Sequence, residues 1–447
     1  MEKSLRESVT AIFLSKKSGK VFTIKRQDYL KVFPGYTSFP GGKVDKEDFN
    51  SLESVPKGMA KHPHHFNALK REIKEELNYE ADLEGTYCIA TALTPEFNPY
   101  RFNVFFYIVP IENEFFFNID EGEAEPEKSG WFSPSDLLQQ YLSGEIMAVP
   151  PVIKIIQALE KDTQLRGPLE VGLGHDEESE VPMIESIAGV RQFLPLSNTF
   201  PPANRTNCFI IGDEVKFLID PSPRDKAEYE KLKRSIDKVG FEKILITHHH
   251  GDHHEQLREL VRDYNVPVCL SKETEKLMNL KFGEGYLEGL NLEYLKEGDY
   301  LTDSCQKAVS IVEVPGHDEG QIALKRDDGA WFLVGDLIQT VGTVVIGGIE
   351  GDMKKYFQSL KKVIALKPRF CIPSHGIAIG GTHKLELTLK HRQMRESEIL
   401  GLYQKGNTKE QILEIVYLGL KETLIPYALK TIEAHLDKLR SEGKIKG

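Results

Sequence analysis

A chain of 447 residues is too long for one ordinary hydrophobic core, so two or three domains are expected. The net charge of −11 argues against nonspecific nucleic-acid binding by the whole surface, and no apolar run approaches the roughly 20 residues that span a bilayer. The five cysteines form no Cys-x-x-Cys pair, and no signal peptide is apparent. We therefore expect a cytoplasmic protein with reduced thiols and no membrane attachment.

The chain opens with two apolar runs, residues 9–14 and 21–24, on either side of a Lys- and Gly-containing turn, which predicts a β-hairpin. A turn-rich loop carrying Phe39-Pro40-Gly41-Gly42 follows. After a polar stretch, a helix is expected over residues 67–77.

That helix places Glu72, Glu75 and Glu76 on one face, because residues three and four positions apart are neighbours. Like charges on one face repel, so the arrangement favours a bound cation. The alternative is a solvated acidic helix surface.

Together, the Gly41-Gly42 loop and the stretch Arg71–Glu76 resemble the Nudix hydrolase signature. The resemblance implies that Glu72, Glu75 and Glu76 hold Mg²⁺ or Mn²⁺ on a diphosphate, with Glu72 catalytic. It also implies that Gly41, Gly42 and Arg71 help to bind the ligand.

The chain departs from this signature in three ways: Asp48 replaces a glutamate, about 15 residues are inserted before Arg71, and Asn78 replaces a glycine. The insertion resembles the branch that includes coenzyme A diphosphatases. A catalytically inactive Nudix domain that senses a nucleotide is the alternative.

Helices over about 136–142 and 151–159 are expected to close this domain, and the polar stretch 163–182 to be a linker. The second half is organised around His248-His249-His250-Gly251-Asp252-His253, between the apolar run 244–246 and a helical pattern. In an extended chain His248 and His250 project to one side. Imidazole and carboxylate groups at this spacing predict a metal site that suits zinc, with iron or manganese as alternatives. A solvated His-rich loop is the other interpretation.

Three later strands end in the same way, with a His or Asp beside glycine. Residues 310–314 lead to His317, 330–334 to Asp336, and 369–373 to His375. One such end is commonly a turn or a cap, but the repetition predicts that all these side chains meet at one edge of the sheets.

At this point the sequence resembles the metallo-beta-lactamase fold superfamily. The resemblance implies one ion on His248, His250 and His317, a second on Asp252, His253 and His375, and Asp336 as a bridge, with Asp252 and Asp336 as catalytic residues. It also implies a four-layer sandwich. Asp318 is a departure, because relatives often carry threonine after this ligand histidine, and it is expected to affect the hydrogen bonding around the ligands.

Residues 384–447 show helical periodicity and end in a short basic segment that is expected to form a strand or wing. They hold 12 Lys or Arg and nine Asp or Glu, a net charge of +3 against −14 for the rest. The pattern resembles the winged helix of lactamase-beta-like endoribonucleases. A helical lid that only packs on the metal domain is the alternative.

The expected architecture is therefore a multidomain α/β and α+β protein. It combines a Nudix α/β/α sandwich (1–162), a linker (163–182), a metallo-beta-lactamase αββα sandwich (183–383) and a small helical, winged-helix-like domain (384–447).

The leading hypothesis is a two-domain metal-dependent hydrolase with two Zn²⁺ (or Fe or Mn) in one domain and Mg²⁺ or Mn²⁺ in the other. The C-terminal site would cleave phosphodiesters, with single-stranded RNA as a candidate partner. The Nudix domain would hydrolyse a nucleotide or coenzyme A-type small molecule. The alternative is acyl-CoA metabolism, with glyoxalase II-like thioester hydrolysis beside coenzyme A diphosphate cleavage. The sequence does not indicate an oligomeric state.

Overall fold

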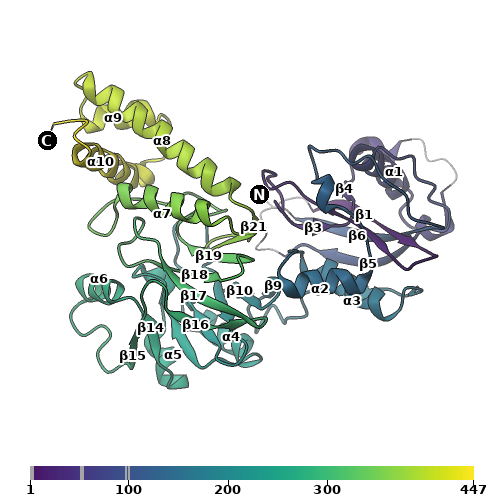
Figure 1. Ribbon diagram of the computed structural model, residues 1–447, viewed down its shortest axis with the longest axis horizontal. Helices are drawn as coiled ribbons and strands as arrows, with labels where there is room; N and C mark the ends of the chain where they lie inside the picture. The colour runs from purple at the N-terminus through teal and green to yellow at the C-terminus, as the bar shows by residue number, and fades with distance from the viewer. Residues whose placement is uncertain (1–4, 51–54, 96–97, 99–100, 447) are drawn as a thin grey trace. The chain divides into compact units, whose positions relative to one another are not determined.

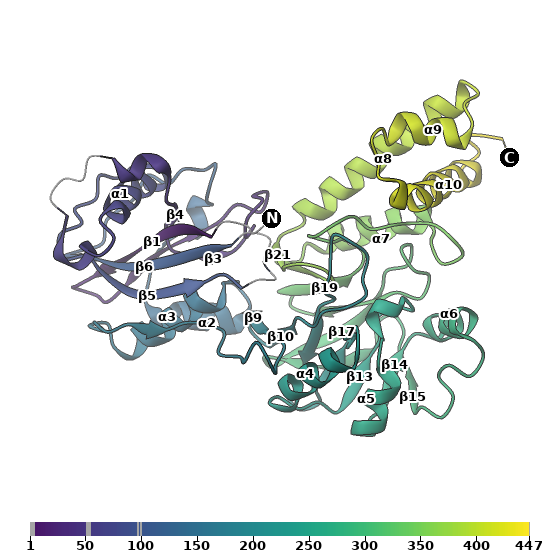
Figure 2. The same ribbon diagram turned by 180° about the vertical axis from the view of Figure 1, so that it is seen from behind.

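The computed structural model describes residues 5–50, 55–95, 98 and 101–446 (Figures 1 and 2). The chain forms two compact units, one reaching Gly174 and including Ile184–Ala188, and the other made of His175–Met183 and the chain from Gly189 onward. Within the described ranges, no helix is long and apolar enough to cross a membrane.

The N-terminal unit is built on an eight-stranded sheet with the order β3-β2-β1-β6-β5-β8, in which β4 also pairs with β1 and β7 with β2. The strands are β1 (Arg6–Ser15), β2 (Val21–Lys25), β3 (Thr37–Ser38), β4 (Gly41–Lys43), β5 (Tyr87–Leu93), β6 (Phe102–Ile111), β7 (Gly130–Phe132) and β8 (Leu169–Glu170). The predicted hairpin is confirmed, with Leu14 opposite Val21.

Helices cover both faces of this sheet. Helix α1 (His64–Leu77) lies on one side, and α2 (Pro134–Ser143) and α3 (Pro150–Lys161) lie on the other (Figures 1 and 2). The apolar side of α1, including Leu69 and Ile73, packs in one core with strand residues such as Val9 and Phe13. The sheet between helical layers confirms the α/β/α sandwich.

Helix α1 ends at Asn78, which adopts the left-handed conformation with φ 48° and ψ 42°. Asparagine tolerates this region better than other non-glycine residues, so the replacement of glycine here leaves the turn intact. One feature was not predicted: Leu169–Glu170, inside the stretch read as a linker, forms β8 and pairs in parallel with β5. The polar composition of the stretch gave no indication of this two-residue pairing. The domain boundaries at 162 and 183 stay predictions.

The C-terminal unit contains two sheets. Within this unit the first has the order β15-β14-β13-β12-β11-β10 and the second β16-β17-β18-β19-β20-β21. The strands of the first are β10 (Val190–Phe193), β11 (Cys208–Ile211), β12 (Phe217–Ile219), β13 (Lys243–Leu245), β14 (Val268–Leu270) and β15 (Leu292–Tyr294). A further strand, β9 (Met183–Ile187), has most of its residues in the N-terminal unit. Those of the second are β16 (Tyr300–Ser304), β17 (Lys307–Glu313), β18 (Ile322–Arg326), β19 (Trp331–Gly335), β20 (Phe370–Pro373) and β21 (Ile379–Gly380).

Each sheet carries helices on its outer face (Figures 1 and 2). Helices α4 (Lys226–Asp237), α5 (Leu257–Tyr264) and α6 (Lys272–Phe282) share a core with the first sheet. Helix α7 (Met353–Leu366) shares a core with the second. Both sheets are rich in fully buried apolar residues, as sheets covered on two faces must be. The αββα sandwich is confirmed.

The tail consists of α8 (His383–Gln404), α9 (Lys409–Val416) and α10 (Ile425–Ser441). These three helices share a small core of their own, formed by Ile399, Ile412, Val416, Ile432 and Leu436. The predicted helices are confirmed. The basic end was expected to be a strand or wing, but residues 442–446 form no strand, because helix α10 continues to Ser441 and only a short turn follows it.

Candidate active sites

The first candidate site lies where the strands of the C-terminal unit end. Strand β13 is an inner strand between β12 and β14, and the chain reaches His248 three residues after the strand ends at Leu245. A short 3-10 turn, Gly251–His253, then reverses the chain before α5. This strand-to-helix turn, predicted from the sequence, brings the histidine-rich segment to one rim of the sandwich.

Three imidazoles meet in a compact triad at this rim. The Nδ1 atom of His250 lies 3.0 Å from Nε2 of His248 and 3.0 Å from Nε2 of His317. Donor atoms that share one tetrahedral zinc ion at 2.0–2.1 Å lie about 3.3 Å apart, so the spacing of the triad suits a single ion.

A second group of donors lies beside the triad and consists of Asp252, His253 and His375. The Nε2 atom of His375 is 3.6 Å from Oδ2 of Asp252. Asp336 lies between the two groups, with Oδ2 3.6 Å from Nε2 of His317 and Oδ1 3.4 Å from Nε2 of His375. The structure thus brings together all seven residues predicted for this site.

Two buried atoms at this centre have no hydrogen-bond partner in the described part of the chain: Nε2 of His253 and Oδ1 of Asp336. An unpartnered buried polar atom costs about 1–3 kcal/mol, so it calls for an explanation. Both atoms face other donors of the same cluster, and a divalent cation would satisfy both. The donor set therefore fits the two-metal centre of the resemblance.

Asp220 organises the ligands from behind. Its Oδ2 accepts from Nδ1 of His253 at 2.8 Å and from the hydroxyl of Thr247 at 2.7 Å. The Thr247 hydroxyl also lies 3.0 Å from Nδ1 of His248. Neither Asp220 nor Thr247 was predicted, although β12 ends directly in Asp220, the same pattern that identified Asp336.

Backbone carbonyls fix two further ligand rings. The Nδ1 atom of His317 is 2.9 Å from the carbonyl oxygen of Val345, and Nδ1 of His375 is 2.9 Å from that of Arg205. In each case the hydrogen bond uses Nδ1 and leaves Nε2 for the centre, as is typical of metal-binding histidines.

Asp318, the departure noted in the sequence, binds His249, the histidine of the motif that is not among the predicted ligands. It forms a short hydrogen bond with Nδ1 of His249, and its other oxygen accepts from the backbone N–H of Gly320 at 2.7 Å. The position therefore fixes the turn that carries the motif, and Asp318 contributes to this site through His249.

The electrostatics match these roles at His248 and Asp336, whereas at His253 and His375 the neighbouring carboxylates outweigh burial and raise the pKa. Burial lowers the pKa of His248 well below its ordinary value, and the nearby imidazoles of His253 and His250 lower it further. Burial would raise the pKa of Asp336, but the adjacent His375 and His253 outweigh it and hold this pKa well below its ordinary value. A neutral imidazole and an ionised carboxylate are the forms that bind a cation.

The second candidate site is the Nudix loop and helix of the N-terminal unit. Gly41 has φ +146°, and a Cβ there would lie 2.2 Å from the carbonyl oxygen of Val9. A Cβ on Gly42 would lie 2.4 Å from a carboxylate oxygen of Glu72. Glycines at these positions allow the loop to pass against both β1 and the acidic helix face.

Arg71 connects the loop to the helix. Its guanidinium donates to Asp48, with Nη2 to Oδ2 at 2.9 Å, and Nη1 donates to Glu72 at 2.8 Å and to Glu75 at 3.1 Å. The cation beside two of the three glutamates is thus Arg71 itself, which lowers the repulsion expected from the sequence. Asp48 holds Arg71 and the loop.

Glu76 is buried and accepts from the backbone N–H of Gly41 at 2.8 Å. Burial raises its pKa to about 8, and burial also raises the pKa of Glu72. The carboxylates of Glu72, Glu75 and Glu76 do not place three oxygens, one from each residue, within 4.8 Å of one another. The three ring nitrogens of the histidine triad do lie within that distance. The glutamates share a helix face as predicted but form a looser group.

Comparisons with known proteins agree with both units. Residues 4–148 match the NUDIX domain, residues 201–375 the metallo-beta-lactamase superfamily, and residues 408–447 the beta-lactamase associated winged helix domain. The chain is 30% identical over 266 residues to the beta-lactamase-like protein 2 homolog of Drosophila melanogaster, a match that covers 54% of this chain and 84% of that one. It is 32% identical over 197 residues to the hydroxyacylglutathione hydrolase of Wigglesworthia glossinidia brevipalpis, covering 43% and 68%.

Among solved structures, a beta-lactamase domain protein from Burkholderia ambifaria aligns with TM-score 0.51 and 20% identity over 60% of this chain and 91% of that one, a likeness of fold. The chain belongs to the metallo-beta-lactamase superfamily, with a NUDIX domain ahead of the metallo-beta-lactamase domain and an associated winged helix domain after it. It is a metal-dependent hydrolase.

Proposed function

We propose that the C-terminal unit hydrolyses phosphodiester bonds in single-stranded RNA at a two-metal centre. The observation that carries the reaction type is the convergence of the histidine triad and the second donor group on Asp336. His248, His250 and His317 would hold one ion, and Asp252, His253 and His375 the other.

Two such ions, when bound, activate water and stabilise the oxyanion that develops in the transition state. The protein supplies the geometry. Asp336 lies between the donor groups, where its ionised carboxylate would accept a hydrogen bond from the attacking water and orient it. Asp220 and the carbonyl groups behind the histidines hold the ligand rings, so that the site needs little reorganisation during reaction.

The tail supports RNA as the substrate class. It carries a net charge of +3 on a chain whose remainder is strongly acidic. Arg392 on α8 donates to the carbonyl of Val344, and Ala434 on α10 packs in the core that contains Val344 and Ile346. The same loop carries the Val345 carbonyl that fixes His317, so the basic helices rest on a wall of the metal site.

The test is cleavage of a labelled single-stranded RNA by the full chain, beside its His250→Ala and Asp252→Ala variants. Both variants should lose cleavage, because each removes a donor from one of the two groups. A matched control is His175→Ala, since His175 lies outside the tail and outside both donor groups, and it should cleave like the wild type. Cleavage that survives in both site variants, or is absent from the metal-loaded wild type, would reject the proposal.

Thioester hydrolysis is the second candidate for the same site. It is favoured by the relative named hydroxyacylglutathione hydrolase, 68% of which the match covers. An S-acyl glutathione and an acyl-CoA assayed beside the RNA would separate the two. Turnover of a thioester that depends on His250, with no cleavage of RNA, would select this candidate.

For the N-terminal unit, we propose pyrophosphohydrolysis of a nucleoside diphosphate derivative, with coenzyme A among the candidate substrates. Glu72, Glu75 and Glu76 would hold Mg²⁺ or Mn²⁺, Glu72 would act in the reaction, and the Gly41-Gly42 loop would approach the phosphates. The support is the contact of Glu72 with Gly42 and of Glu76 with Gly41, which joins loop and helix into one acidic surface.

This proposal is tested by assaying coenzyme A, ADP-ribose and nucleotide sugars with the full chain in Mg²⁺ or Mn²⁺. Glu75→Gln should greatly reduce turnover, while Glu84→Gln, a carboxylate that is also exposed, should not. Tight binding of one compound without turnover of any would replace the enzyme with a nucleotide sensor.

A further inference from the structure

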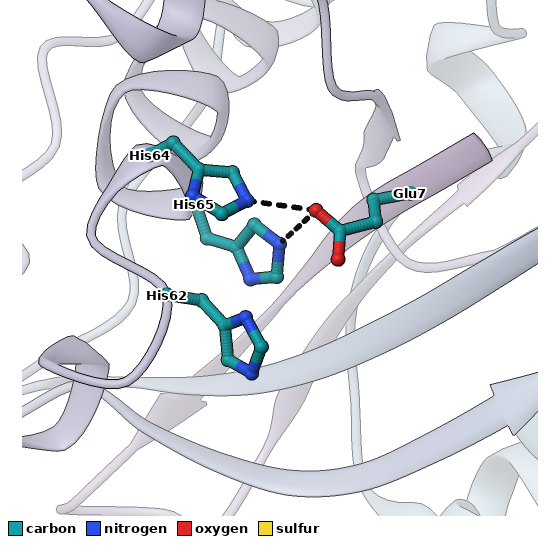
Figure 3. A group of neighbouring side chains, drawn as sticks. All are labelled: Glu7, His62, His64 and His65. Carbon is teal, nitrogen blue, oxygen red and sulfur yellow. Dashed lines mark hydrogen bonds and ion pairs between the residues drawn. The ribbon is translucent and has the colours of Figure 1, made fainter.

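Three histidines and a glutamate gather in the N-terminal unit away from its acidic helix face (Figure 3). His62 precedes α1, His64 and His65 form its first turn, and Glu7 lies on β1. In Figure 3 the side chain of Glu7 projects from the strand towards the histidine side chains. The histidines belong to the inserted stretch before Arg71, which the Nudix signature does not use.

The donor atoms of these four residues form one compact group. Oε2 of Glu7 is 2.7 Å from Nε2 of His64 and 3.2 Å from Nε2 of His65. The rings of His62 and His65 stack with centroids 4.8 Å apart and an interplanar angle of 9°. All four residues offer one donor atom within 4.8 Å of the others.

This cluster is separate from the proposed Nudix site. His64 begins α1, whereas Glu72, Glu75 and Glu76 lie about 12 to 18 Å further along the axis at 1.5 Å per residue. The glutamates and the histidine cluster therefore cannot share one ion.

We propose that Glu7, His62, His64 and His65 bind one Zn²⁺ ion, at a structural site distinct from both hydrolytic centres. Three imidazoles and a carboxylate are ligands that zinc accepts, and four protein ligands are the number found in closed structural sites. Their donor atoms all lie within 4.8 Å of one another, so small side-chain shifts bring them to the separation of about 3.3 Å expected around a tetrahedral zinc ion.

The surroundings of the cluster support this assignment. Nδ1 of the buried His65 is 2.7 Å from the hydroxyl of Tyr107, a contact that fixes the ring and leaves Nε2 directed at Glu7. Partners of this kind orient metal-binding histidines. The imidazole of His62 makes no hydrogen bond with any described residue, although it stacks on His65. A bound ion gives this ring a partner.

Zinc at this position would join the two parts of the Nudix signature. Strand β1 carries Glu7 and also pairs with β4 of the glycine loop, with Val9 opposite Gly42. Helix α1 carries the other ligands and the acidic face. An ion between β1 and the first turn of α1 would therefore fix the helix against the loop and raise the stability of the unit.

The competing explanation is a metal-free network in which both histidines donate to Glu7. It predicts no dependence on zinc. The two explanations differ in the amount of zinc that the full chain binds and in the effect of His62, which stands outside the hydrogen-bonded network.

The experiment uses the full chain equilibrated with Zn²⁺ alone and then freed of excess metal by gel filtration. Elemental analysis should find about one zinc equivalent more in the wild type than in His62→Ala and in Glu7→Gln. The affinity of the site should fall by more than the roughly 10–100-fold that loss of an outer partner causes. His391→Ala, an exposed histidine outside all clusters, is the matched control and should keep the wild-type zinc content.

A second measurement guards against variants that fail to fold. Trp331→Phe leaves Trp131 as the only tryptophan in the sequence, so that fluorescence reports on the N-terminal unit. In this background, zinc should raise the unfolding temperature of the N-terminal unit when the four proposed ligands are unchanged. Equal zinc content in wild type, His62→Ala and Glu7→Gln would overturn the proposal. So would an unfolding temperature of the N-terminal unit that zinc does not change in the wild type.

Discussion

Asp220 shows how one buried carboxylate can position two histidines of the candidate metal site. It contacts His253 directly and reaches His248 through the hydroxyl of Thr247. Its other oxygen accepts from the backbone N–H of Thr247 at 2.8 Å, so it also holds the end of the strand that leads to the motif. Asp220 is fully buried, and its effect on the metals would be exerted through these contacts.

We expect Asp220→Asn to lower metal affinity about 10–100-fold without removing a ligand, because an amide has only one acceptor oxygen. It cannot accept both from His253 and the Thr247 hydroxyl on one side and from the Thr247 backbone N–H on the other. Zinc competition with a chromogenic chelator measures the change. Asp263→Asn, which removes a carboxylate at the surface, should leave affinity unaltered. Wild-type affinity in Asp220→Asn would mean that packing alone orients the rings.

Glu76 leads to a prediction about pH. Burial raises its pKa in the folded protein to about 8, above its ordinary value of 4.5. The folded state therefore binds this proton more tightly than the unfolded state. The stability associated with the proton is fully present below pH 4.5 and is lost as pH rises towards 8.

In metal-free buffer, the N-terminal unit of the wild type should therefore lose stability relative to Glu76→Gln between pH 5 and pH 8. Because a single proton is involved, the difference in free energy of unfolding between the two proteins changes by at most about 1.4 kcal/mol per pH unit. Urea unfolding followed through Trp131 in a Trp331→Phe background measures it. Parallel pH profiles of the two proteins would show that Glu76 is ionised throughout this range.

At the scale of elements, α7 connects the metal site to the core of the second sheet. It begins at Asp352, whose Oδ1 accepts from the backbone N–H groups of Lys354 at 2.7 Å and Lys355 at 2.9 Å. The backbone N–H of Asp352 donates to the carbonyl of Gly316, next to the ligand His317. The helix start is thus tied to the turn that presents a ligand.

Asp352→Ala should lower the free energy of unfolding of the C-terminal unit by about 1 kcal/mol, the usual effect of removing an N-cap side chain. Urea unfolding followed through Trp331 in a Trp131→Phe background measures this. The control is Thr382→Ala at the start of α8, where no side chain caps the helix. A loss in the control as large as in Asp352→Ala would contradict the capping argument.

At the scale of the whole molecule, charge is distributed unevenly, because a basic tail follows an acidic chain. Lys405, Lys421 and Lys430 are exposed in this tail and form no ion pair with a described residue. If the tail holds RNA, these ammonium groups contact phosphates and release counterions.

Replacing the three lysines with glutamine should weaken RNA binding and reduce the slope of log affinity against log salt by about 2, since each single-strand phosphate contact contributes about 0.7. Fluorescence anisotropy across a salt series measures both. Lys17, Lys31 and Lys61, exposed in the N-terminal unit, give a control with the same change in net charge. Identical slopes in the two triple variants would identify the tail as a packing element only.

The sequence by itself indicated most of the chain's elements and the seven residues that the structure brings together at the candidate two-metal centre. Buried strands that end in His or Asp deliver those side chains to one edge whatever the detailed packing, so His248, His317, Asp336 and His375 could be identified from local pattern alone. The same applies to the shared helix face of Glu72, Glu75 and Glu76, which follows from helical spacing.

Only the tertiary structure decided which distant groups meet. Asp220 reaches His253, Arg71 reaches Asp48, and Glu7 reaches His64 through contacts between segments far apart in the chain. Short strands such as Leu169–Glu170 likewise form because a neighbouring strand offers an edge, with no periodicity of their own. Such contacts depend on how sheets and helices pack, and local hydrophobic spacing carries no information about them.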